Sequence, residues 1–211
     1  MDASKDITGY AYDGAGLNHS HEYLLPAVMR HLESIAAKRE RAKIFELGCG
    51  NGSVANELAA AGYDVTGVDP SAEGLAHANR RYPTLKLAQG SAYDDLAGRY
   101  GRFPAVVSLE VVEHLYFPKK YAATLYDLLE PGGSAFISTP YHGYWKNLAL
   151  AVTGKLDDHF TALWDHGHIK FWAFKTLRRL LEEAGFRDIS FQRVGRVPLF
   201  AKSMIAVARK P

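Results

Sequence analysis

Cysteine is almost absent from this chain of 211 residues, which has a single one, Cys49. One thiol cannot build an internal disulfide framework, so the composition fits a reducing compartment. Long hydrophobic runs are missing as well: no stretch resembles a signal peptide, and none is long enough to span a bilayer. We therefore expect a cytoplasmic protein, peripheral to a membrane at most.

An excess of charge of one sign is also lacking. The chain has 25 Lys and Arg against 23 Asp and Glu, which gives a net charge of +2 and no basic stripe. No strong field for nucleic acid follows, and we expect no nucleic-acid partner. We find no internal repeat and no low-complexity tract. With 47% hydrophobic residues, residues 1–211 suit one α/β domain with a full core.

The most informative feature that is present is a glycine-rich turn. An apolar run that ends at Leu47 is followed by Gly48, Gly50 and Gly52, and an amphipathic segment begins at Ser53. This order predicts a strand, a tight turn and a helix, with a backbone that can approach a ligand closely. A second predicted strand ends at Asp69, where a βαβ unit places a carboxylate for a ribose diol. The pattern predicts a site for a nucleoside cofactor.

Two cofactor classes use such a turn, and the residues favour one of them. A dinucleotide site has glycine where this chain has Ser53, so its third glycine comes one residue early here. Glu46 stands beside the turn, where a carboxylate would repel a pyrophosphate and attract a cationic ligand. S-adenosylmethionine carries a sulfonium and an ammonium. Both features therefore favour S-adenosylmethionine over NAD.

Strand and helix patterns alternate through the rest of the chain. Residues 1–20 look like a loose polar arm, and 21–38 have helical periodicity, so 1–40 form an N-terminal arm and helix. Strands are predicted at 44–47, 64–68, 85–88, 105–109 and 135–138, with helices at 54–61, 73–80, 118–129 and 174–184. Strands at 189–193 and 204–208 have no helix between them and must pair as a hairpin. The prediction is an α/β, Rossmann-like fold with a seven-stranded, mostly parallel sheet and an antiparallel C-terminal hairpin.

Residues 140–170 interrupt this alternation and are rich in aromatic and aliphatic residues, among them Trp145 and Trp164. Loops of this length often serve as lids or binding elements. Because the segment follows the fifth strand, it lies at the edge of the sheet where ligands bind. We predict an inserted lid that covers a small-molecule acceptor or makes peripheral contact with a membrane. A short helix that completes the core is the alternative.

An acidic and histidine cluster follows the fourth strand. If a helical turn starts there, Glu110, Glu113 and His114 share one face. Two carboxylates and an imidazole can hold a divalent ion. His114 can instead act as a general base that an acid orients. In a third interpretation, the acids simply stabilise a helix N-terminus.

The ordered motifs resemble those of class I S-adenosylmethionine-dependent methyltransferases. Residues 46–52 look like the first motif, 67–71 like the second, and 129–133 like the turn before the fifth strand. Ser91 stands where the family often has an acid. The resemblance implies that the cofactor is bound by Glu46, Gly48, Cys49, Gly50, Asp69, Pro70, Ser91, Ala92 and Leu109.

The sequence Glu-Val-Val-Glu-His at 110–114 resembles the O-methyltransferases of ubiquinone synthesis. That resemblance implies a divalent metal such as Mg²⁺ on Glu110, Glu113 and His114. We predict O-methylation of a hydroxylated ring, quinone-like or phenolic, with His114 and His142 as catalytic candidates. Methylation of nitrogen, carbon or a sugar hydroxyl is the nearest alternative. An NAD-dependent oxidoreductase and a non-catalytic cofactor-binding module are the others.

Overall fold

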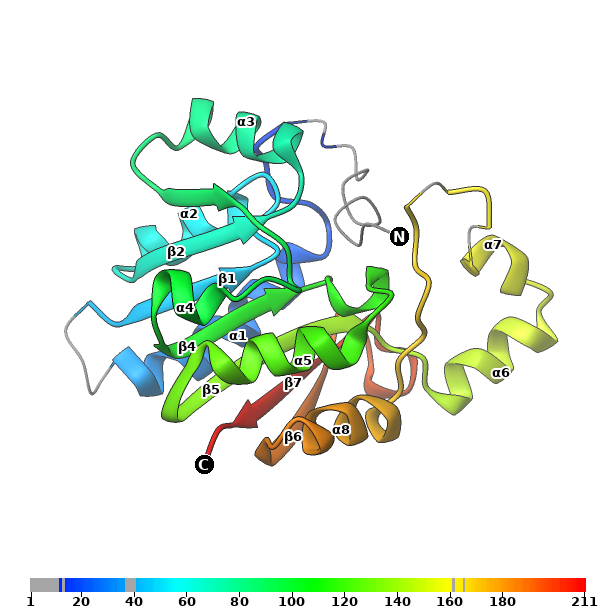
Figure 1. Cartoon of the computed structure of the whole chain (residues 1–211). Helices are drawn as coiled ribbons and strands as arrows, with labels where there is room; N and C mark the ends of the chain where they lie inside the picture. The colour runs from blue at the N-terminus through cyan, green and yellow to red at the C-terminus, as the bar shows by residue number, and fades with distance from the viewer. Residues whose placement is uncertain (1–11, 13, 37–40, 161, 165) are drawn as a thin grey trace.

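The computed structural model describes residues 12, 14–36, 41–160, 162–164 and 166–211. Its centre is one seven-stranded sheet with the strand order β3-β2-β1-β4-β5-β7-β6 (Figure 1). The strands are β1 (Lys43–Leu47), β2 (Asp64–Asp69), β3 (Lys86–Gln89), β4 (Phe103–Leu109), β5 (Leu129–Pro140), β6 (Arg187–Val194) and β7 (Ser203–Arg209). This order confirms the predicted Rossmann-like fold.

The pairing of the strands also matches the prediction. β1 pairs in parallel with β2 and β4, β2 with β3, and β4 with β5. β7 runs antiparallel to both β5 and β6, and it lies between them. β4 is the central strand, and all seven of its residues are buried, as a parallel strand covered on both faces requires.

Helices cover both faces of the sheet because strand side chains alternate between them. α1 (His21–Ala36) and α2 (Ser53–Ala60) pack on the face that includes Ile44. α4 (Leu96–Tyr100), α5 (Pro118–Asp127) and α8 (Phe174–Glu183) pack on the face that includes Phe45. α3 (Ala72–Arg81) lies against β2 and β3. The predicted first helix extended to Lys38, which lies outside the described residues.

The insertion after β5 contains two helices that stand away from the sheet. α6 (Tyr144–Val152) and α7 (Leu156–Phe160) lie beyond the end toward which the parallel strands point (Figure 1). Neither helix has a buried residue, so they do not complete the core. Within the described residues, none of the helices combines the length and the apolar character needed to cross a bilayer.

Candidate functional site

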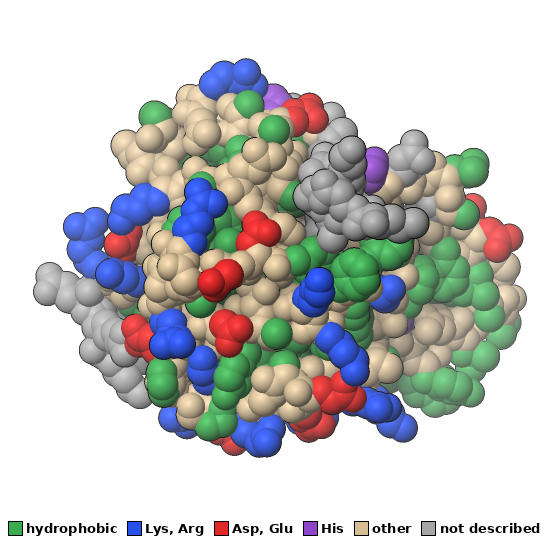
Figure 2. All heavy atoms as spheres, viewed as in Figure 1, with side chains coloured by type: hydrophobic (Ala, Val, Ile, Leu, Met, Phe, Trp, Pro, Cys, Tyr) green, Lys and Arg blue, Asp and Glu red, His purple; other side chains and the backbone are tan. Residues whose placement is uncertain are grey.

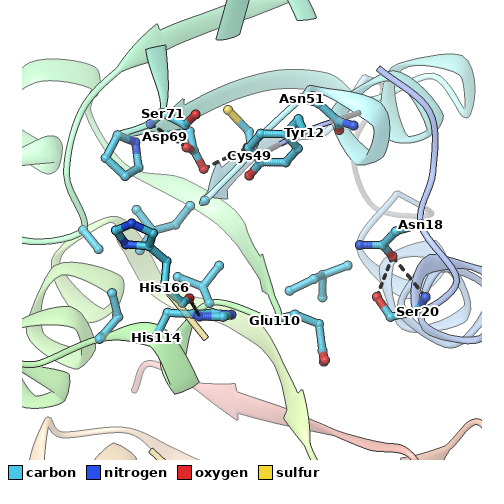
Figure 3. A pocket seen from close by; sticks show the side chains of 18 of the residues that line it. Tyr12, Asn18, Ser20, Cys49, Asn51, Asp69, Ser71, Glu110, His114 and His166 are labelled. Carbon is cyan, nitrogen blue, oxygen red and sulfur yellow. Dashed lines mark hydrogen bonds between the residues drawn. The ribbon is translucent and has the colours of Figure 1, made fainter. Parts of the chain in front are cut away.

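A cavity of about 580 Å³ opens at the carboxyl ends of the parallel strands. Six segments line it: the β1–α2 turn, the end of β2, the residues that follow β3, the end of β4 with the residues that follow, four N-terminal residues between Tyr12 and His21, and the second half of the insertion. Figure 3 shows Asp69 and Tyr12 on one side of this cavity, with His114 and Glu110 on the other. The cavity therefore lies where an open α/β sheet binds its ligands.

The glycine turn between β1 and α2 forms one wall. Gly48 and Gly50 have φ angles of 87° and 48°, in the left-handed region that disfavours side chains. A Cβ on Gly48 would lie 2.4 Å from Cγ2 of Val111, and one on Gly50 would collide with the ring of Tyr12. Both glycines, which were predicted to bind cofactor, line the cavity. The turn brings bare backbone to the ligand, as the sequence indicated.

Asp69 ends β2 and fixes the turn beside it. Its Oδ2 accepts a hydrogen bond of 2.9 Å from Gly50 N, and its Oδ1 accepts one of 2.8 Å from Ser71 N. Each carboxylate oxygen has a second lone pair, so the side chain can also accept bonds from a ribose diol. Burial raises the pKa of Asp69 to about 6, although the two backbone N–H groups oppose that shift.

Glu46 is the strongest electrostatic feature of the cofactor side. It is 3% exposed, it lines the cavity, and its Oε2 has no hydrogen-bond partner among the described residues. Burial, followed by the charge of Asp69, raises its pKa to about 8. A buried carboxyl that lacks a partner favours a cationic ligand, which would restore the ionised form.

The remaining predicted cofactor residues divide into two groups. Cys49, Pro70, Ala92 and Leu109 line the cavity, whereas Ser91 does not. Ser91 N donates to Asp94 Oδ2, and its hydroxyl accepts from Tyr93 N, so the side chain stabilises its own turn. The contact between Ser91 and adenine therefore stays a prediction, with no support from the Ser91 side chain in this geometry. Burial raises the pKa of the Cys49 thiol, which rules against a nucleophilic role.

The N-terminal residues were predicted to be a loose arm, and the described part of them is not. Tyr12, Asn18 and Ser20 line the cavity, together with His21, the first residue of α1. Gly14 and Gly16 accept bonds from Asn51 in the glycine turn. Residues 1–11 and 13 lie outside the described residues. Sequence reasoning missed this wall because short polar segments have no periodicity. The aromatic ring of Tyr12 was the only available signal.

Glu110 does not join Glu113 and His114 as predicted. It has a φ of 55° and stands before the 3₁₀ turn η2 (Val112–His114), so no helical face includes all three. Its Oε1 accepts a bond of 2.8 Å from Ser138 Oγ, and its Oε2 one of 3.4 Å from Ser203 Oγ. Burial raises the pKa of Glu110 to about 7. The carboxylate lines the cavity but is directed to the ends of β5 and β7.

His114 lies at the cavity wall opposite Asp69 (Figure 3). Its Nδ1 lies 3.1 Å from His166 O and 3.2 Å from Gly167 O. Carbonyls only accept, so Nδ1 carries the proton and Nε2 carries the basic lone pair. Burial lowers the pKa of His114, although the two carbonyls oppose the shift. A neutral imidazole whose tautomer is fixed suits a general base.

His114 forms a group with two other residues, Glu113 and His168. One ligand atom each from Glu113, His114 and His168 lies within 4.8 Å of the others. Glu113 is 1% exposed, and neither of its carboxyl oxygens has a hydrogen-bond partner among the described residues. Burial and the charge of Glu110 raise its pKa. His168 lies 54 positions after His114 in the sequence, so no local pattern indicates this contact.

His142, the second catalytic candidate, does not line the cavity. It packs among the rings of His159, Phe160 and Phe171, with centroid distances of 5.0 to 6.1 Å. Burial lowers its pKa to about 4. It therefore contributes to the packing of the insertion, and a catalytic role has no support in the geometry.

The acceptor side of the cavity is lined by rings from two segments. Tyr116 follows η2, while Phe160, Trp164 and His168 belong to the insertion. Two backbone bonds, from Ile169 N and Lys170 N to Glu113 O, tie the insertion to η2. Besides these rings, the side chains of Glu110 and His166 line this part of the cavity, beside the imidazole of His114.

Comparisons with known proteins agree with this geometry. Residues 18–190 match the family model of a methyltransferase domain. The chain is 27% identical over 161 residues to the ubiquinone biosynthesis O-methyltransferase of Aromatoleum aromaticum. These residues make up 74% of this chain and 69% of that protein. It is 32% identical over 152 residues to the protein of the same name from Thiobacillus denitrificans, which covers 68% and 63%. Other relatives of that name are matched over about half their length.

Among solved structures, phosphoethanolamine N-methyltransferase 2 of Haemonchus contortus in complex with S-adenosyl-L-methionine shares the fold. It has a TM-score of 0.61 and 16% identity, over 87% of this chain and 52% of that one. The glycine turn, Asp69 and the cavity thus have the arrangement of a nucleoside-cofactor site of the Rossmann-like class. The chain belongs to the methyltransferase domain family that its residues 18–190 match.

Proposed function

We propose that this methyltransferase transfers the methyl group of S-adenosylmethionine to a hydroxyl oxygen on a ring, quinone-like or phenolic. The observation that carries the proposal is the aromatic acceptor side of the cavity, where Tyr116, Phe160 and Trp164 line the same space as His114. Aromatic walls with a few polar groups suit a hydroxylated ring. The relatives named ubiquinone biosynthesis O-methyltransferase support the same substrate class.

The reaction needs alignment more than it needs covalent help from the protein. The acceptor oxygen attacks the methyl carbon in line with the breaking carbon–sulfur bond, and S-adenosylhomocysteine leaves. Glu46 and Asp69 hold the cofactor at one end of the cavity, and the rings of the insertion hold the acceptor at the other. Fixing two reactants in this way accounts for a large part of a rate enhancement.

The hydroxyl proton needs an acceptor, and His114 is placed to take it. Its Nδ1 is held by the carbonyls of His166 and Gly167, so Nε2 receives the proton. The lowered pKa keeps the imidazole neutral near pH 7, in the form that can act as a base. The imidazolium that forms is stabilised by the same two carbonyls.

The residues present do not fit the Mg²⁺ ion that was predicted. Mg²⁺ takes six oxygen ligands in octahedral geometry, whereas the gathered trio supplies one carboxylate and two imidazoles. Both oxygens of Glu110 already accept bonds from serine hydroxyls. We derive no step through Mg²⁺ and expect turnover to persist in a chelator. Activity that is lost in chelator and restored by Mg²⁺ would contradict this assignment and favour the metal.

The insertion also supports a peripheral contact with a lipid surface. Apolar side chains of α6 are exposed, with Trp145 at 58% and Val152 at 79%. They adjoin exposed residues of the 3₁₀ turn η3 (Pro198–Phe200) in the β6–β7 connection. Figure 2 shows hydrophobic atoms gathered on this side of the molecule. Sedimentation with vesicles tests the contact, and a protein that stays in the supernatant with anionic and neutral vesicles alike would exclude it.

The acceptor itself is tested by product analysis. The protein is incubated with S-adenosylmethionine labelled in its methyl group and with matched acceptors: a catechol, an aniline and a sugar. We expect label on the phenolic oxygen of the catechol. Label on the aniline nitrogen or the sugar hydroxyl would instead support the alternative acceptors of the same fold. No labelled product with any acceptor, despite tight cofactor binding, would favour a non-catalytic module.

A further inference from the structure

Asn51 occupies the glycine turn, but its side chain is directed away from the sheet and toward the N-terminal residues. Its Nδ2 donates to Gly14 O at 2.7 Å and to Gly16 O at 3.0 Å. Its Oδ1 accepts from Ser53 N at 3.2 Å, which fixes the orientation of the amide. Asn51 is 9% exposed. One buried side chain thus joins the cofactor turn to a segment 35 to 37 residues earlier in the chain.

A second hydrogen bond holds the same segment from another element. The hydroxyl of Tyr82, at the end of α3, donates to Ala15 O at 2.8 Å. Tyr82 does not line the cavity. Three consecutive carbonyls, those of residues 14, 15 and 16, therefore accept bonds from two separate parts of the fold.

The residues on either side of this attachment reach the ligand. Tyr12 precedes it and lies so close to Gly50 and Gly74 that a Cβ on either would meet its ring within 3 Å. Asn18 and Ser20 follow it and line the cavity, and the Asn18 side chain accepts bonds from Ser20 that fix the entry into α1. Figure 3 shows Tyr12 beside Asn51 and Cys49 at the cofactor side.

We propose that Asn51 is a positioning residue that holds residues 14–16, and with them Tyr12, Asn18 and Ser20, as a strap across the cofactor. The strap forms one wall of the cofactor side of the cavity. Its hydrogen bonds must break for the cofactor to leave, so Asn51 and Tyr82 govern release of S-adenosylmethionine and S-adenosylhomocysteine. This inference concerns cofactor exchange and does not depend on the identity of the acceptor.

The chemistry of the strap explains why this turn has asparagine. An amide offers two donor hydrogens and one acceptor, which match two carbonyls and the Ser53 N–H. Aspartate has the same shape but would place a carboxylate oxygen against the Gly14 and Gly16 carbonyls. Serine or threonine could not span both carbonyls. The residue type is therefore set by the strap rather than by the turn alone.

The test measures release of S-adenosylhomocysteine by stopped flow from the full chain carrying Asn51→Asp, Tyr82→Phe or the control Tyr63→Phe. Asn51→Asp keeps the acceptor for Ser53 N and removes both donors. Tyr82→Phe removes one bond to the strap and leaves the glycine turn untouched. Tyr63 is a buried core tyrosine outside the cavity. We expect release to be about tenfold faster for Asn51→Asp and about threefold faster for Tyr82→Phe, since a net hydrogen bond contributes about 0.5–1.5 kcal/mol.

Tyr82→Phe decides the matter, because it acts on the cofactor only through the strap. Release unchanged by Tyr82→Phe, with Asn51→Asp still faster, would overturn the proposal and confine Asn51 to the glycine turn. Hydrogen exchange of residues 14–20 gives an independent readout. We expect cofactor to slow exchange there in the native chain and to slow it less in both variants. If cofactor leaves exchange of this segment unchanged, the strap does not cover it.

Discussion

The two halves of the cavity are built in different ways. On the cofactor side, ligand groups are backbone atoms and carboxyls locked by short bonds, such as those from Gly50 N and Ser71 N to Asp69. On the acceptor side, the walls are rings from an insertion whose helices bury nothing against the sheet. The first half is rigid because parallel strands define it. The second half depends on a few bonds, chiefly those from Ile169 N and Lys170 N to Glu113 O.

The difference indicates which half determines specificity. A cofactor common to many enzymes can be bound by a fixed turn, whereas acceptors differ and need adaptable walls. Mutations on the cofactor side should therefore alter affinity for S-adenosylmethionine, and those on the acceptor side should alter turnover or surface binding. The following tests probe that division, and they begin with the largest expected effect.

Replacing His114 by alanine should separate chemistry from cofactor binding. We expect turnover to fall by about 10²–10⁴-fold, the usual contribution of a general base. Cofactor affinity should change little, because Glu46 and Asp69 remain. Steady-state kinetics and calorimetry measure the two effects, with His77→Ala on α3 as the control outside the cavity. If cofactor affinity falls by as much as the rate, His114 contributes to cofactor binding as well, and the two sides of the cavity are not functionally separate there.

Replacing Asp69 by alanine should instead weaken binding of the cofactor. The substitution removes the charge-assisted bonds to a ribose diol and frees Gly50 N and Ser71 N. We expect affinity for S-adenosylmethionine to fall by roughly 1.5–3 kcal/mol. Asp64→Ala, at the opposite end of β2, is the matched control because Asp64 bonds only the exposed Lys86. Equal affinities for the two variants in calorimetry would show that Asp69 is not the ribose ligand.

Glu46 should make both stability and binding depend on pH. Its folded pKa is about 8 against an ordinary 4.5, so between these values the folded state holds a proton that the unfolded state loses. Its contribution to stability is therefore complete below pH 4.5 and is lost as pH rises toward about 8. A cationic cofactor favours the ionised form, so binding near pH 7 should release a proton.

Calorimetry in buffers of different ionisation enthalpy measures that proton, and Glu46→Gln should abolish the release. Asp69 has a pKa of about 6, so its own titration adds to the proton release at the lower end of this pH range. The measurement is therefore made at pH 7 and above. Denaturant unfolding of Glu46→Gln without cofactor should lose stability less steeply between pH 5 and 8. Identical pH profiles for the native chain and the variant would show that Glu46 is ionised when folded.

The smallest effect is expected on the outer face of α6. Trp145→Ser should change the free energy of unfolding by no more than about 0.5 kcal/mol, because the side chain is largely exposed. If α6 touches a lipid surface, the same variant should reduce sedimentation with vesicles. Leu181→Ser, at a fully buried position of α8, is the contrasting control and should destabilise the fold strongly. A comparable destabilisation by Trp145→Ser would make α6 part of the core.

The sequence was sufficient to predict the sheet. Alternating apolar residues and turn glycines are local signals, so β1, the turn that follows it, the place of Asp69 at the end of β2 and the final hairpin were all predicted correctly. Glu110 and His142 show the limit of this approach. Each was predicted from its position along the chain, but bonds from the hydroxyls of Ser138 and Ser203 hold Glu110, and neighbouring rings surround His142. The Glu113–His168 contact and the bond from Asn51 to Gly14 also join residues far apart in the chain. Neither contact produces a periodic pattern in the sequence from which it could be predicted.

The position of β7 has a consequence for how the chain is made. β7 is synthesised after β6 but lies between β5 and β6, so β6 has no partner in the sheet until β7 has emerged. During translation, β1 to β5 can pair before β7 has been synthesised, whereas β6 and α8 cannot yet take their places beside the sheet. Closing this part of the sheet joins residues far apart in the chain, which is a slow step in folding. A nascent chain stalled before Ser203 should therefore expose the edge of β5 to chaperones.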